Sequence, residues 1–163
     1  MGKAVFQLLD RTQAEVILPQ MFDILFTNMS RIAPTGGSYA QDKQMWMAYM
    51  TSEAGKDQQI ILMYVDEVLA GYFQYSIKKD TMLIEEIEIM PEYQRTLLFY
   101  RFFKFVSNVI PTDVMYIEAY INKGNKNSMT IAKKLGMQIV GENRTGTSWH
   151  YQGESRKFKM QSR

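Results

Sequence analysis

The sequence contains no cysteine and a single histidine, His150. The lack of cysteine excludes disulfide bonds, cysteine-ligated zinc, iron–sulfur clusters and a cysteine nucleophile. A metal site built from several histidines is excluded too, and any histidine-based mechanism would depend on His150 alone. We therefore predict no metal site.

Long apolar runs and a strong excess of one charge are also missing. No run approaches the roughly 18 residues of a membrane span, and the first six residues resemble neither a signal peptide nor a myristoylation signal. Nineteen Lys and Arg against 17 Asp and Glu leave a net charge of +2, which does not by itself imply nucleic acid. We expect a cytoplasmic protein with neither a membrane nor a nucleic-acid partner.

The composition is that of a globular protein. Of 163 residues, 46% are hydrophobic and 22% are charged, which suits one domain with a sizeable core. The sequence holds no internal repeat, low-complexity tract or long linker. We therefore expect a single domain over residues 1–163.

Two helices are expected in the first half. Apolar residues recur at helical spacing from Val16 to Met29 and predict a helix there, and a shorter one follows at about 42–50. Thr12 and Glu15 have the spacing of a capping box, which would start the first helix. Pro19 lies inside that helix and should kink it, since proline lacks a backbone donor.

Strand patterns dominate the remaining sequence. Short runs rich in Ile, Val, Leu, Tyr and Phe predict strands, and amphipathic segments at 96–109 and 125–135 predict helices. Helices alternate with strands in the second half, so part of the sheet should be parallel, and we expect an α/β (α+β) fold with a mixed sheet. The expected strands are 4–9, 59–65, 68–77, 81–90, 114–121, 137–142 and one within 149–160.

One stretch joins an apolar strand to the start of a helix. Residues 87–91 read Ile-Glu-Ile-Met-Pro, and residues 94–99 read Gln-Arg-Thr-Leu-Leu-Phe. A helix N-terminus offers unpaired N–H groups and partial positive charge, which suits a pyrophosphate. Arg95 could add a charge-assisted contact there.

A second stretch reads Asn-Lys-Asn-Ser at 125–128 and Lys-Leu-Gly-Met at 134–137. Together with the hairpin at 60–72 and the order of elements, these stretches resemble the GNAT acetyltransferase superfamily, most strongly over residues 81–142. The resemblance implies a mixed, mostly antiparallel sheet of about seven strands with a central splay, flanked by about four helices. It also implies acetyl-CoA as co-substrate.

The resemblance assigns the coenzyme contacts. Backbone groups of the strand would pair with the pantetheine arm, the helix start would hold the pyrophosphate, and Asn125 would contact the arm. Leu97 and Phe99 stand where the family has small residues, and Ala132 stands where many members place a tyrosine acid. The implied cofactor-binding residues are Ile87, Ile89, Gln94, Arg95, Thr96, Leu97, Leu98, Phe99, Asn125 and Ser128.

Two carboxylates are the catalytic candidates. A period of two places Glu86, Glu88 and Met90 on one face of their strand and Ile87 and Ile89 on the other. Carboxylates in a half-buried strand are unusual. Either they line an acceptor cleft, attract an ammonium group and take its proton, or they pair with Lys or Arg of a neighbouring strand. We favour Glu88 over Glu86 as the base.

The sequence thus predicts an acetyl-CoA-dependent N-acetyltransferase. A small-molecule or peptide primary amine would attack the thioester directly, without a metal. The alternative is a GNAT-fold domain that has lost catalysis and serves as a binding or interaction module, with Leu97, Phe99 and Ala132 in its favour. The aromatic-rich helix that includes residues 99–105 holds more large side chains than one face can bury, which leaves a homodimer open.

Overall fold

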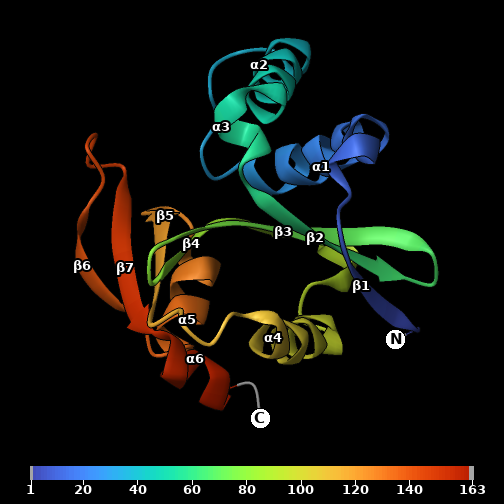
Figure 1. Cartoon of the computed structure of the whole chain (residues 1–163). Coiled ribbons are helices and arrows are strands. Elements are labelled where there is room, and N and C mark those ends of the chain that lie inside the picture. Colours follow the sequence, from blue (N-terminus) through green and yellow to red (C-terminus); the bar gives the residue numbers. More distant parts are fainter. Residues whose placement is uncertain (1, 162–163) are drawn as a thin grey trace. The chain divides into compact units, whose positions relative to one another are not determined.

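The structure is a computed structural model that describes residues 2–161. Over this range, seven strands form a sheet of order β1-β2-β3-β4-β5-β7-β6 (Figure 1). β4 and β5 pair in parallel, whereas β1–β2, β5–β7 and β6–β7 pair antiparallel. The predicted α+β class with a mixed sheet is thereby confirmed. The strands are β1 (Ala4–Leu8), β2 (Gln59–Val65), β3 (Val68–Lys78), β4 (Thr81–Ile89), β5 (Tyr116–Asn122), β6 (Gln138–Glu142) and β7 (Ser148–Glu154).

The helices include the four that the sequence predicts. These are α1 (Ala14–Met29), α2 (Tyr39–Thr51), α4 (Leu97–Val109) and α5 (Lys126–Lys134). Two further helices, α3 (Glu53–Lys56) and α6 (Ser155–Gln161), were not expected, and short 3₁₀ turns lie at η1 (Arg11–Gln13) and η2 (Pro91–Tyr93).

The strand expected within 149–160 is confirmed, but the helix that follows it in that range was not expected. The strand stops at Glu154, and the helix α6 begins at Ser155. The backbone N–H of Ser155 donates to the Met115 carbonyl at 2.9 Å, and its hydroxyl donates to the Val114 carbonyl at 2.5 Å. These long-range bonds anchor the turn from strand to helix, and the helix residues themselves include no β-branched side chain.

The predicted capping box at Thr12 is also wrong. The Asp10 carboxylate accepts hydrogen bonds from the Thr12 backbone N–H at 2.9 Å and from its hydroxyl at 2.8 Å, which closes the turn η1. The charged acceptor thus engages the hydroxyl that would have capped α1. α1 begins at Ala14 without a side-chain cap and continues through Pro19.

α2 begins three residues earlier than expected because of a capping box that the sequence reading missed. The Ser38 hydroxyl accepts from the Gln41 backbone N–H at 3.2 Å, and the Gln41 side chain accepts from the Ser38 N–H at 2.9 Å. Two orphan donors at the helix start are therefore satisfied, which starts the helix at Tyr39.

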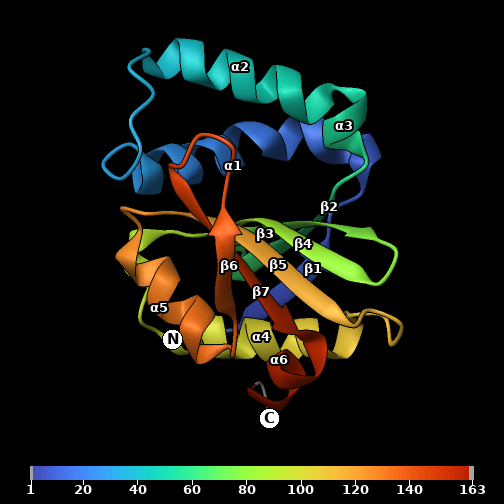
Figure 2. The ribbon, with the colours of Figure 1, turned by 90° about the vertical axis from the view of Figure 1, so that its left-hand side faces the viewer.

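The chain divides into two compact units. The first comprises the residues up to Gln74 together with Glu86–Leu98, and the second comprises Tyr75–Glu85 together with the residues from Phe99 on. In the first unit, α1 and α2 lie on the same side of the β2–β3 hairpin, with α1 nearer to the strands (Figures 1 and 2). Its core joins helix and strand residues, among them Leu18, Met21, Met50, Ile60, Leu62 and Tyr72.

The second unit contains the ladder of β5, β7 and β6, which Figure 2 shows side by side. Phe103 of α4 contacts Phe158 of α6, with ring centroids 4.9 Å apart. Both rings are buried, as is Tyr151 of β7. This packing explains why the end of the chain forms a helix rather than more strand.

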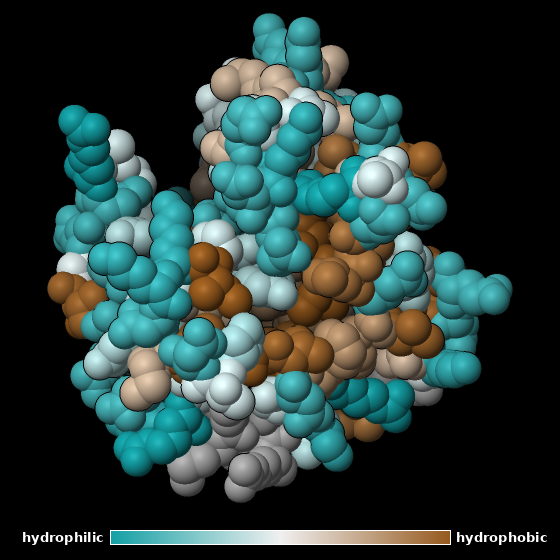
Figure 3. All heavy atoms as spheres, viewed as in Figure 1, coloured by the Kyte–Doolittle hydropathy of each residue, from teal (hydrophilic) through white to brown (hydrophobic). Residues whose placement is uncertain are grey.

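Hydrophilic residues prevail on the face that Figure 3 shows, and hydrophobic residues reach it in places. Val68, Leu97 and Tyr100 are among the large apolar side chains of the chain that are exposed. None of the helices described is both long and apolar enough to pass through a bilayer.

Candidate functional site

Glu88 of β4 is the centre of the candidate site. Its side chain is only 6% exposed, although it carries a carboxylate. The Asn28 side-chain amide, near the end of α1, donates to Glu88 Oε2 at 2.7 Å and to the Ile89 carbonyl at 2.9 Å. The sequence left two readings open. Within residues 2–161, Glu88 does not pair with a Lys or Arg, and the donor to its carboxylate is instead the neutral amide of Asn28.

Burial raises the pKa of Glu88 to about 7, since the charged form loses hydration. The hydrogen bonds from Asn28 and with Glu86 lower the pKa of Glu88, but their effects are smaller than that of burial. A carboxyl group with a pKa near 7 exchanges its proton easily at neutral pH, which suits a general base.

Tyr72 of β3 lies close to the same carboxylates. Its side chain is fully buried, and its hydroxyl has no hydrogen-bond partner among the residues that the structure describes. Burial, and then the charges of Glu86 and Glu88, raise the pKa of Tyr72 well above its usual 10. The phenol therefore stays neutral beside the two carboxylates. The sequence reading missed Tyr72 and Asn28, because each looks like an ordinary residue of its strand or helix.

Gln94 ties the next segment to the end of β4. Its side-chain amide donates to the Ile89 carbonyl at 2.9 Å and lies 3.4 Å from the Asn28 side-chain oxygen. The Ile89 carbonyl, predicted to pair with pantetheine, thus accepts from two of the protein's own amides.

Arg95 adopts a backbone conformation that favours glycine. Its φ is +60°, in the left-handed region. Within residues 2–161 its guanidinium makes no hydrogen bond or ion pair, and the residue is exposed. A free cation therefore precedes the N-terminus of α4, where the sequence predicts a phosphate contact.

The first turn of α4 is partly capped by Thr96. The Thr96 hydroxyl donates to the Tyr93 carbonyl at 2.6 Å and lies within 3.2 Å of the Leu98 backbone N–H, which donates to it. Leu97 is 60% exposed. A phosphate bound here would have to share the Leu98 backbone N–H with the Thr96 hydroxyl or displace that hydroxyl from it.

Asn125 and Ser128 belong to the second unit. The Asn125 side chain accepts from the Ser128 backbone N–H at 3.1 Å and thereby caps α5. Ala132, in place of the usual tyrosine, is buried. The structure thus gives Asn125 a local structural role.

His150, the single histidine, lies on β7. Its ring stacks on Tyr120 with centroids 4.5 Å apart, and its Nε2 lies 3.6 Å from Glu118 Oε1. Gln152 donates to the same Glu118 oxygen at 3.1 Å. The stacked ring and its carboxylate neighbour give His150 a packing role on β7.

The raised pKa of Glu88 predicts a fall in stability as the pH increases. Between about pH 4.5 and 7 the unfolded chain ionises this carboxyl while the folded protein keeps it protonated, so the free energy of unfolding should decrease by about 3 kcal/mol across that window. Urea denaturation at several pH values should show the slope, and Glu88→Gln should remove it. Equal slopes in both proteins would contradict the assignment.

Comparison with known proteins gives a match in structure but not in sequence. No protein-family model matches the chain, and no curated protein matches it. Many solved structures do match.

Three of these structures illustrate the likeness. PaiA N-acetyltransferase from Thermoplasma acidophilum, solved with coenzyme A, has a TM-score of 0.70 at 12% identity, covering 93% of this chain and 99% of its own. An acetyltransferase from Thermus thermophilus has a TM-score of 0.70 at 10% identity, with 93% and 97% covered. A mutant form of the spermidine/spermine N-acetyltransferase SpeG from Vibrio cholerae has a TM-score of 0.59 at 14% identity, with 98% of each chain covered.

Identities this low establish an architecture and leave substrate and mechanism open. The matches extend over nearly the whole chain, and the seven-stranded mixed sheet of residues 2–161 agrees with the sheet that the resemblance implied. The chain therefore has the GNAT acetyltransferase fold.

Proposed function

We propose that this protein is an acetyl-CoA-dependent N-acetyltransferase in which Glu88 is the general base for a primary amine. The observation that carries the proposal is the Glu88 carboxyl group, which is buried in β4, held by Asn28 and given a pKa of about 7. The fold supports it, because matched structures include N-acetyltransferases, one of them solved with coenzyme A.

Acetyl-CoA would supply the acetyl group as a thioester, and the amine would attack the thioester carbonyl directly. The new C–N bond replaces the C–S bond, and coenzyme A leaves as its thiolate. Glu88 takes the proton that the attacking nitrogen loses, directly or through a water molecule, and Asn28 keeps the carboxylate in place. A backbone N–H near Ile89 would polarise the thioester carbonyl. Glu86, on the same face of the strand, is the second candidate for the base.

At the coenzyme end, the pantetheine arm is assigned to backbone groups of Ile87 and Ile89 in the first unit. In the second unit, Asn125 and Ser128 are assigned to the coenzyme on the sequence motif alone. The pyrophosphate is assigned to Gln94–Phe99, with Arg95 as its cation. The guanidinium of Arg95, which has no partner within residues 2–161, fits a phosphate. The side-chain amides of Asn28 and Gln94 donate to the Ile89 carbonyl. Either they move away when the pantetheine arm binds, or the arm pairs with Ile87 alone.

A second candidate is a binding module without catalysis. Two observations favour it: the Thr96 hydroxyl already caps Leu98, and the Asn28 and Gln94 amides already occupy the Ile89 carbonyl. In this case the backbone groups that would bind the coenzyme already have hydrogen-bond partners within the protein, and the fold binds another ligand.

Calorimetry with acetyl-CoA decides between the two candidates. Arg95→Glu should weaken binding about tenfold or more, because a charge-assisted contact is replaced by repulsion. Arg95→Gly suits the left-handed backbone, so it isolates the loss of charge. Arg101→Glu, an exposed arginine of α4, is the matched control and should bind like the unchanged protein.

The enzyme hypothesis fails if acetyl-CoA shows no saturable binding at millimolar concentration, and the assigned phosphate site fails if Arg95→Glu binds as well as Arg101→Glu. Where binding is found, a panel of amines identifies the acceptor by mass spectrometry. Spermidine is a reasonable first member, since matched structures include a spermidine N-acetyltransferase.

A further inference from the structure

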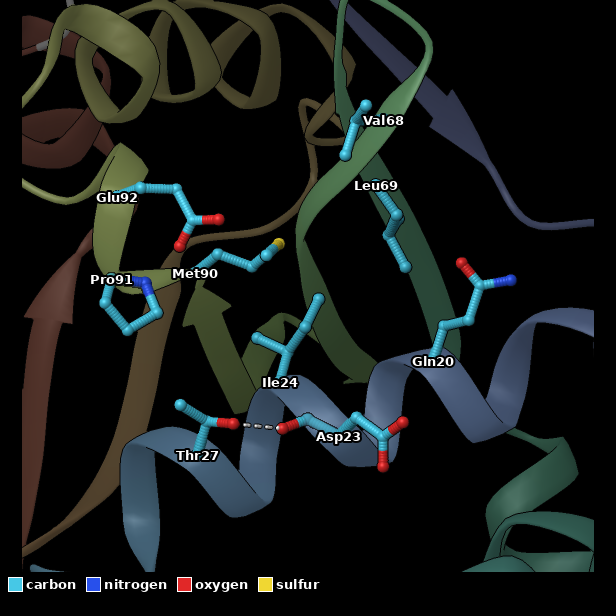
Figure 4. A pocket seen from close by; sticks show the side chains of 9 residues that line it. All are labelled: Gln20, Asp23, Ile24, Thr27, Val68, Leu69, Met90, Pro91 and Glu92. Atoms are coloured by element: carbon cyan, nitrogen blue, oxygen red, sulfur yellow. Dashed lines mark hydrogen bonds between the residues drawn. The ribbon is translucent and has the colours of Figure 1, made fainter.

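A pocket of about 410 Å³ opens in the first unit. It lies between α1, the start of β3 and the segment that follows β4 (Figure 4). Ile24, Leu69 and Met90 contribute apolar surface, and Val68 extends it at the rim. This volume falls in the range of small-molecule sites, which is roughly 300–1,000 Å³.

The charged residues that line the pocket are both acidic. Asp23 comes from α1, and Glu92 comes from the turn after β4. Asp23 is partly neutralised, because it accepts a hydrogen bond from the Tyr39 hydroxyl and lies 3.9 Å from Lys43 Nζ. Glu92 is exposed, and the described part of the chain provides it with no hydrogen bond or ion pair. Glu92 is therefore the free anion of the pocket.

We propose that this pocket binds an organic cation with an alkyl body, such as a protonated alkylamine. The ammonium group lies beside Glu92, with Asp23 as a secondary partner, and the methylene groups pack on Ile24, Leu69 and Met90. Apolar surface favours the alkyl chain, while two carboxylates attract a cation and repel an anion.

Binding of a cation at this pocket does not depend on the proposed acetyl transfer. Glu86 and Glu88 are not among the residues that line the pocket. The Glu88 side chain is buried, and its carboxylate accepts a hydrogen bond from Asn28. Binding at the pocket is therefore measured without acetyl-CoA, so its failure and the failure of the enzyme hypothesis are separate results.

The test is a titration followed by NMR of methyl groups, with three probes that share a six-carbon chain: hexylammonium, 1-hexanol and hexanoate. Hexylammonium should shift the methyl signals of Ile24, Leu69 and Met90 in a saturable way. 1-Hexanol should bind about three- to fivefold more weakly, the worth of one exposed ionic contact. Hexanoate should not bind measurably.

Variants tie the effect to the pocket. Glu92→Gln should weaken hexylammonium about three- to fivefold and leave 1-hexanol unchanged. Glu53→Gln removes an exposed carboxylate of α3 and serves as the matched control, with no change expected. Val68→Phe enlarges a side chain that is 51% exposed at the rim and should abolish binding of hexylammonium and of 1-hexanol without disturbing the core.

Four results would overturn the proposal. The first is that the shifts caused by hexylammonium do not saturate, and the second is that 1-hexanol or hexanoate binds as tightly as hexylammonium. The third is that Glu92→Gln binds hexylammonium as tightly as Glu53→Gln does. The fourth is that the shifted methyl groups lie outside the pocket.

Discussion

Glu88→Gln is expected to lower kcat/KM for amine acetylation about 10²–10³-fold, the usual contribution of a general base. Glutamine keeps the shape of the side chain and still accepts a hydrogen bond from Asn28, but it takes no proton. The pH profile should change as well. In the unchanged protein the rate should rise with ionisation of a group near pH 7, and this limb should disappear in the variant.

The matched control for this experiment is Glu85→Gln. Glu85 lies on the same strand but faces the other side, so its loss should change the rate less than about threefold. Glu86→Gln separates the two candidates for the base. Full activity in Glu88→Gln together with a large loss in Glu86→Gln would transfer the role to Glu86, and full activity in both would remove the carboxylates from the mechanism.

Gly71→Ala is expected to lower the free energy of unfolding by about 3 kcal/mol. A Cβ at this position of β3 would lie 2.4 Å from the Glu88 carbonyl oxygen and 3.1 Å from the Ile89 Cα. Both are backbone atoms of β4, so relief of the clash requires the strand itself to shift. Because that strand holds Glu88, acetyl-transfer activity should decrease with stability.

Gly141→Ala of β6 is the matched control, since a Cβ there meets nothing within 4 Å. Both substitutions reduce the freedom of the unfolded chain equally, so the difference between them isolates the close approach of β3 and β4. Urea denaturation measures it. Equal stability of the two variants would show that the strands separate at no cost.

The sequence was most informative where structure repeats with a short period. Alternation along residues 81–90 placed Glu86 and Glu88 on one face, and in the folded chain these two groups interact with one another. Helical spacing located α1, α4 and α5 to within a few residues. These patterns are local, because a side chain faces the core or the solvent according to its neighbours two, three or four positions away.

Element ends were less predictable. Thr12 and Ser38 have the same capping chemistry, yet Asp10 engages the first hydroxyl and only the second begins a helix. Ser155 begins α6 because two carbonyls about 40 residues earlier accept its hydrogen bonds. A local pattern cannot rank such competing partners.

The sequence by itself determined the order of the strands and of four helices, the motifs of the predicted coenzyme site and the pair of carboxylates on one face. Tertiary structure alone decided the chemistry of that pair, because Asn28 is 60 residues from Glu88 in sequence and the pKa depends on burial. It also decided the left-handed backbone of Arg95 and the acidic pocket, which three separate segments build. Desolvation and contacts between distant segments exist only in the folded chain, so no local pattern encodes their magnitude.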